Sequence, residues 1–170
     1  MPEYKTHNTG AVRKDIRLTG FDYSNPYSYF ITICTAERKR LFWRRDREFI
    51  LSALGESVDL YINEIPAHYA LIRVDKYVIM PDHVHLLLTI CGELPGEDKQ
   101  RPYINNVINQ FKGIVTKKAG FPIWQRRFYD HVCRSEKDYD NIWYYIDYNP
   151  YKYTNPDDYE EYLKNNGKPL

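Results

Sequence analysis

Residues 80–88 read MPDHVHLLL, and this short stretch decides which fold we expect. The Pro-Asp pair predicts a turn, and the apolar run that follows predicts a strand over residues 84–91. Side chains alternate along a strand, so His83 and His85 share one face and the apolar residues around them occupy the other. We therefore expect the apolar face to pack in the core. The opposite face carries two imidazoles close enough to chelate one ion.

The sequence on either side predicts helices and further strands. The helices are predicted from the helical spacing of apolar residues, and the strands from runs rich in apolar, β-branched and aromatic residues. The predicted elements are a strand over 29–34, a helix over 46–61, a strand within 66–78, a helix over 105–118, a strand over 128–133 and a helix over 135–148. The last helix opens at a capping-box pattern and stops before Pro150. This order predicts an α+β fold, an antiparallel sheet with helices mainly on one face.

Length and composition set the broad class. A chain of 170 residues with 43% hydrophobic content suits one domain over 1–170, with residues 1–12 as a loose polar tail. No apolar run approaches the roughly 18 residues of a membrane span, and the start has no secretory signal. The three cysteines cannot all pair within the chain. We therefore expect reduced thiols, a cytoplasmic location and no membrane contact.

Charge is segregated along the chain. Residues 101–137 carry eight Lys or Arg against two Asp or Glu, interleaved with aromatic residues. That mixture suits phosphate neutralisation and base stacking. We expect a basic cluster along the approach to the site, made of Lys112, Lys117, Lys118, Arg126 and Arg127. Solvated surface charge without a partner is the alternative explanation.

The last predicted helix carries a second candidate constellation. Tyr145 and Asn149 are four residues apart and so share a helical face, which would place a nucleophile and an oxygen ligand together. Spacing alone does not choose Tyr145 over Tyr144 or Tyr148. The His-x-His pair alone does not establish a metal site either, because two ligands are too few to complete such a site. Two hydrogen-bonded surface histidines would give the same sequence pattern.

Five motifs in order resemble the single-tyrosine HUH transposases, and in particular the branch associated with repetitive extragenic palindromes (REP). They cover nearly the whole chain. The motifs are RL at 17–18 with DY at 22–23 and YFIT at 29–32; IMPDHVHLL at 79–87; FKG at 111–113; WQ at 124–125 with FYDH at 128–131; and YI at 145–146 with NP at 149–150. Many family members have Asn where this chain has Asp82.

The resemblance implies a ferredoxin-like, RNA-recognition-like sheet that carries the His pair. It also implies a divalent ion, Mg²⁺ or Mn²⁺, bound by His83 and His85 with Asn149 as the third ligand. The family's Tyr-Ile-x-x-Asn-Pro frame assigns the nucleophile to Tyr145. The implied reaction is cleavage and rejoining of single-stranded or hairpin DNA through a 5′-phosphotyrosine intermediate, as in transposition. A homodimer is a further implied possibility.

Two other functions compete with this one. A catalytically silent or host-adapted protein of the same fold that binds DNA hairpins would keep the basic and aromatic surfaces without needing the full constellation. A histidine-triad nucleotide hydrolase needs His-x-His-x-His, and the third position here is Leu87. The ordered motifs argue against a purely structural protein.

Overall fold

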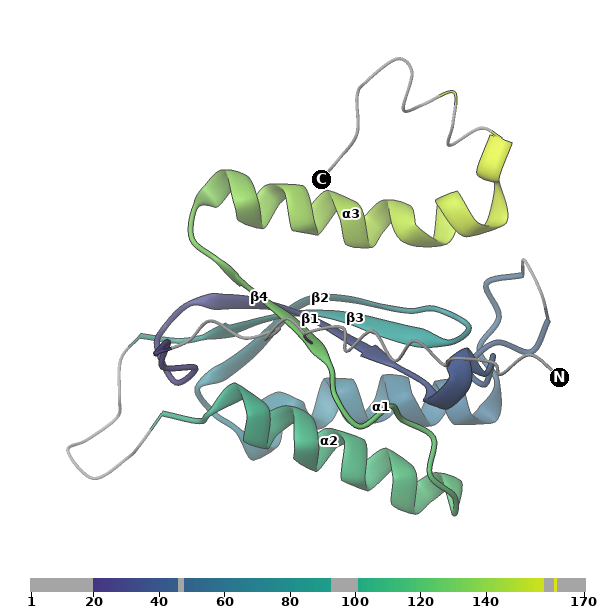
Figure 1. The fold of residues 1–170 in the computed structure, drawn as a ribbon, viewed down its shortest axis with the longest axis horizontal. Coiled ribbons are helices and arrows are strands. Elements are labelled where there is room, and N and C mark those ends of the chain that lie inside the picture. The colour runs from purple at the N-terminus through teal and green to yellow at the C-terminus, as the bar shows by residue number, and fades with distance from the viewer. Residues whose placement is uncertain (1–19, 46–47, 93–100, 158–160, 162–170) are drawn as a thin grey trace, which may run out of the picture.

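A four-stranded antiparallel sheet forms the centre of the molecule (Figure 1). The computed structural model describes residues 20–45, 48–92, 101–157 and 161. Its elements, in chain order, are β1 (Ser28–Cys34), a short 3₁₀ turn η1 (Ala36–Arg38), α1 (Ala53–His68), β2 (Ile72–Ile79), β3 (His83–Ile90), α2 (Ile104–Ala119), β4 (Tyr129–Cys133) and α3 (Glu136–Thr154). The predicted loose tail, residues 1–12, lies outside the described residues.

The strand order is β2-β3-β1-β4, and every neighbouring pair runs antiparallel. This is the order of a ferredoxin-like fold, so the predicted α+β class is confirmed. Helices α1 and α2 cover one face of the sheet, and α3 crosses the other face (Figure 1). The sheet is thus the middle layer of three, and α3 stands apart from the other two helices.

Alternation along the central strands sorts side chains between these two layers. Ile31 and Ile33 of β1 and Val84 of β3 are fully buried, as expected for the core beneath α1 and α2. Thr32 of β1 lies opposite His85 of β3, and this pair lies on the α3 side. The sheet therefore has one apolar face and one face that mixes apolar and polar side chains, which is where a site can form.

The first helix differs from its prediction at both ends. It begins at Ala53 rather than residue 46, because Ser52 caps it by accepting a hydrogen bond from the Gly55 N–H at 3.1 Å. It also continues through Pro66 to His68, so the predicted strand over 66–78 is shortened to β2. Pro66 is tolerated because the buried Ile65 holds the last turn against the core.

The end predicted for the last helix was also wrong. Helix α3 passes through Pro150 and ends at Thr154. A proline removes one backbone hydrogen bond but does not forbid a helix whose next turn is held by tertiary contacts. Here Tyr153 packs edge-on against Trp43, with ring centroids 5.4 Å apart. Asn149 is consequently inside the helix, one turn after Tyr145, rather than at its end.

Candidate active site

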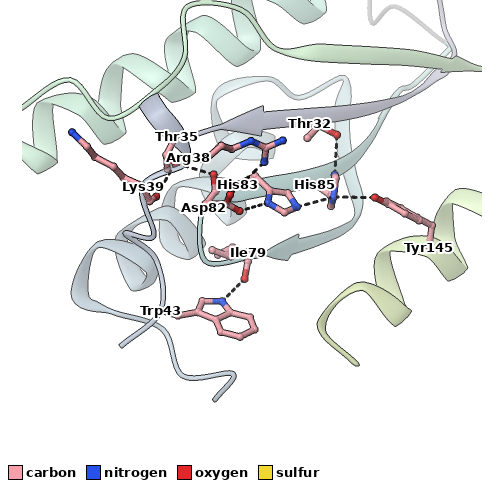
Figure 2. A network of polar contacts seen from close by, with 10 residues as sticks. All are labelled: Thr32, Thr35, Arg38, Lys39, Trp43, Ile79, Asp82, His83, His85 and Tyr145. Atoms are coloured by element: carbon pink, nitrogen blue, oxygen red, sulfur yellow. Dashed lines mark hydrogen bonds and ion pairs between the residues drawn. The ribbon is translucent and has the colours of Figure 1, made fainter. Parts of the chain in front are cut away.

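Two imidazoles meet on the α3 side of the sheet. His83 begins β3 and His85 follows two residues later, and their Nε2 atoms lie 3.1 Å apart (Figure 2). Two ligand atoms about 2.1 Å from one ion, at neighbouring corners of an octahedron, would lie roughly 3 Å apart. The separation of the two nitrogens therefore suits one small divalent ion.

Each ring is oriented by a partner at its other nitrogen. The Nδ1–H of His83 donates to the Asp82 carboxylate at 2.6 Å, which leaves the lone pair on Nε2. Nδ1 of His85 lies 2.8 Å from the Thr32 hydroxyl, which can accept a hydrogen bond from it. Partners of this kind fix the tautomer and the ring orientation in metal sites.

Burial keeps both rings neutral. It lowers the pKa of His83, although the Asp82 hydrogen bond opposes this effect. Burial, reinforced by the neighbouring His83 and by the positive charge of Arg38, lowers the pKa of His85 to about 3. A neutral imidazole is the form that binds a metal ion. Among the described residues no group of three or more His, Cys, Asp or Glu side chains is placed to hold an ion. A third ligand from those residues would have to be of another type.

Tyr145 brings a hydroxyl to the same place from the opposite layer. Its oxygen lies 3.5 Å from Nε2 of His85. The rings of Phe30 and His85 are stacked at 5.2 Å, and the edge of Tyr145 meets both. Helical spacing alone did not distinguish Tyr145 from Tyr144 and Tyr148. Tyr144 is 57% exposed, and neither Tyr144 nor Tyr148 lines the cleft described next. The structure thus brings Tyr145, and not these neighbours, to the His pair.

A cleft of about 810 Å³ opens between the sheet and α3 around these groups. Asn149 is among its lining residues, so the four predicted residues His83, His85, Tyr145 and Asn149 share one cavity. Sequence reasoning missed several other residues that line it. The lining residues beyond the four are Phe30, Thr32, Cys34, Arg38, Met80, Tyr129, Lys152, Tyr153 and Pro156.

Arg38 stands out among the residues that were missed, because its backbone is unusual. Glu37 and Arg38 have φ values of 54° and 55°, and no other non-glycine residue in the described part of the chain has a positive φ. The buried Thr35 holds this turn, since its hydroxyl lies 2.7 Å from the Lys39 carbonyl and 3.0 Å from that of Asp82. Backbone strain of this kind gathers at functional sites. Figure 2 shows Arg38 reaching the Asp82 carboxylate, 3.5 Å away.

The predicted basic cluster does not line this cleft. Lys112 is a clear error: its side chain is buried, and Nζ donates to the carbonyls of Gln125 at 2.8 Å and Arg126 at 3.1 Å. Lys117 and Lys118 are exposed on α2, across the sheet from the site. The side chains of Arg126 and Arg127 are exposed just before β4, but neither lines the cleft. Within the described ranges, the cations that do line it are Arg38 and Lys152.

Comparisons with known proteins find relatives of this chain in sequence and in fold. No family model matches the chain. A Haemophilus influenzae protein named only as an uncharacterized protein is 33% identical, over 81% of this chain and 88% of its own length. A second protein of that organism, named "Putative REP-associated tyrosine transposase", is 29% identical over 78% of this chain and 74% of its own. The REP-associated tyrosine transposase of Escherichia coli is 34% identical over 48% of this chain and 46% of its own.

Among solved structures, a REP-associated tyrosine transposase bound to a REP hairpin matches with a TM-score of 0.58. It is 24% identical, and the match covers 89% of this chain and 74% of that one. At this identity the match speaks for the fold. No helix within the described ranges is long and apolar enough to cross a membrane. In sequence and in fold, the chain is thus similar to proteins named as REP-associated tyrosine transposases.

Proposed function

We propose that this protein is a transposase that cuts and rejoins single-stranded DNA, with Tyr145 as nucleophile. One observation carries the proposal. The Tyr145 hydroxyl lies 3.5 Å from a nitrogen of His85 that is itself 3.1 Å from its counterpart on His83. A nucleophile and two ion ligands thus converge on one point from two different layers of the fold.

The proposed ion is Mg²⁺ or Mn²⁺, held by His83, His85 and the amide oxygen of Asn149. The neutral rings, their spacing and the presence of Asn149 in the same cleft support this set. When bound, such an ion polarises the scissile phosphate and fixes its oxygens for in-line attack. Two imidazoles favour Mn²⁺ in affinity, because Mg²⁺ prefers oxygen ligands.

The residues of the chain supply the remaining chemistry. The Tyr145 oxygen forms a bond to phosphorus, and the bond from phosphorus to the 3′ oxygen breaks. The phenol loses its proton and the leaving 3′ oxygen gains one, so the products are a 5′-phosphotyrosine and a free 3′-hydroxyl. Attack by another 3′-hydroxyl reverses the step and joins strands without an external energy source. Arg38 and Lys152 would neutralise the phosphate charge inside the cleft.

The proposed substrate is hairpin DNA with single-stranded flanks. A matched transposase of the same fold is described as bound to a REP hairpin. The cleft also mixes cations with aromatic rings, a combination that suits a flexible single strand. A scissile phosphate in an unpaired segment could reach the His pair between the sheet and α3.

The test is covalent capture. The wild-type protein, incubated with Mn²⁺ and a labelled single-stranded oligonucleotide that folds into a hairpin with unpaired flanks, should give a protein–DNA adduct that survives denaturation. Tyr145→Phe should abolish the adduct and preserve hairpin binding, because it removes one oxygen and keeps the ring. Tyr144→Phe is the matched control, since that side chain is exposed on the same helix.

Two outcomes would count against the proposal. Hairpin binding with no adduct from the wild-type protein would favour the silent DNA-binding alternative. An adduct that persists in Tyr145→Phe would place the nucleophile elsewhere, and Tyr153, which also lines the cleft, would be the next residue to replace.

A further inference from the structure

A second hollow adjoins the cleft between β4 and the start of α3. It has a volume of about 330 Å³ and is lined by Phe30, Tyr129, His131, Asp138, Ile142 and Tyr145. Three of these residues also line the cleft, so the two cavities meet beside the proposed nucleophile. Small-molecule pockets have volumes of roughly 300–1,000 Å³, so the hollow can hold a flat heterocycle. We call it the base hollow.

One wall of the base hollow is a half-exposed aromatic ring. Tyr129, the first residue of β4, is 49% exposed and borders both the cleft and the base hollow. Phe30 and Ile142, which are buried, add apolar surface. An exposed ring at the border of a DNA-cleaving cleft is a stacking platform, since every nucleobase presents a π-face.

The polar side of the base hollow is a fixed pair. Nε2 of His131 lies 2.9 Å and 3.1 Å from the two oxygens of the Asp138 carboxylate. Asp138 is in the first turn of α3, and its N–H is capped by the Ser135 hydroxyl at 3.1 Å. This cap and the sheet hold the pair in place before any ligand arrives. A carboxylate accepts hydrogen bonds, so the pair suits a partner with N–H groups at its edge.

Charge separates the occupants of the two cavities. The cleft contains Arg38 and Lys152, which suit a phosphate, whereas the base hollow contains the Asp138 carboxylate, which repels one. A nucleotide carries the complementary pair of groups, an anionic phosphate and an uncharged base. Adjoining cavities of these two kinds therefore match one nucleotide of a single strand.

We propose that the base hollow binds the unpaired nucleobase next to the scissile phosphate, which stacks on Tyr129 and donates hydrogen bonds to the His131–Asp138 pair. The inference rests on the proposed function, because it takes a DNA phosphate to occupy the cleft. It adds a determinant of where the strand is cut, since a base that fits the hollow fixes the register of the strand.

The test combines a protein variant with an altered oligonucleotide and measures binding alone, so it does not depend on cleavage. Affinity is measured by fluorescence anisotropy in the Tyr145→Phe background, with the hairpin oligonucleotide and versions carrying one abasic position in the unpaired flank. Removing the base at one flanking position should weaken binding roughly 5- to 150-fold, the range of base–aromatic stacking. Tyr129→Ala should give a similar loss with the intact oligonucleotide and no further loss with that abasic version.

Two controls make the cycle specific. Tyr129→Phe keeps the ring and should keep the affinity. Tyr144→Ala removes an exposed tyrosine that does not line the base hollow. It should leave the ratio of affinities for the intact and abasic oligonucleotides unchanged. Asp138→Asn should change which flanking base is preferred, a readout that a merely structural role would not move.

The outcomes separate the two proposals. If the losses from Tyr129→Ala and from each abasic position multiply, or if Tyr129→Ala loses nothing, the base hollow is refuted even where the wild-type protein forms its adduct. Failure of any hairpin oligonucleotide to bind would overturn both proposals. If the losses of affinity from Tyr129→Ala and from the abasic position do not multiply, but the wild-type protein forms no adduct, the base hollow is supported and the proposed cleavage is refuted.

Discussion

Lys112→Met is the substitution that best separates a structural lysine from a DNA-binding one. Its ammonium group is buried and donates to two backbone carbonyls, at 2.8 Å and 3.1 Å. Hydrogen bonds from a charged group contribute about 1.5–3 kcal/mol each. Burial lowers the pKa of Lys112, so desolvation of the ammonium offsets part of that gain. Methionine keeps an unbranched apolar chain, one atom shorter than lysine, but leaves both carbonyls without the donor.

We expect this variant to lose about 2–4 kcal/mol of unfolding free energy. For a chain of this size that corresponds to a Tm lower by roughly 5–15 °C. Thermal unfolding followed by circular dichroism measures the change, and Lys117→Met, an exposed position on the same helix, is the control. Hairpin affinity measured well below the Tm should stay within about twofold of wild type. Unchanged stability with clearly weakened DNA binding would refute this assignment.

Three further substitutions test the site and the fold. Asp82→Ala should weaken Mn²⁺ binding by about 10- to 100-fold in calorimetry, because the imidazole that Asp82 orients loses its partner; equal affinity would mean that the ring needs no orienting group. Arg38→Gln should reduce the slope of log affinity for hairpin DNA against log salt by about 1, whereas Lys39→Gln should not; equal slopes would remove Arg38 from the phosphate path. Gly55→Ala should cost roughly 1–3 kcal/mol in chemical denaturation, because its new Cβ would lie 2.2 Å from the Phe42 carbonyl oxygen; a neutral effect would show that the α1 start can shift.

The parts of the fold that were predictable follow from strict alternation. His83 and His85 fall on one face of β3 because the side-chain period of a strand is two, and this needs no knowledge of distant residues. The end of α3 was not predictable in this way. A rule about Pro150 describes the local backbone, whereas the packing of Tyr153 on Trp43, which is distant in sequence, keeps the last turn helical.

Two of the errors about the site, at Lys112 and at Arg38, have different origins. Lys112 had a signal that was overlooked, since it lies four residues after Ile108 and three before Val115 and so falls within the buried stripe of α2. Arg38 had no such signal. Its position depends on a left-handed turn held by Thr35 and Asp82, two residues far apart in the sequence, and no local pattern of Glu and Arg indicates that conformation.

The division of the site between two layers has a consequence for its tolerance to change. The imidazoles belong to the sheet and the tyrosine belongs to α3, so the distance between them depends on how that helix docks as well as on the contacts of Tyr145 with Phe30 and His85. Lys76 of β2 makes one such contact: it pairs with Asp147 and lies 4.3 Å from the centre of the Trp143 ring, on the side of α3 that meets the sheet. Small changes at this remote contact would tilt the helix and alter how well the hydroxyl is aimed, while leaving every group of the site chemically intact.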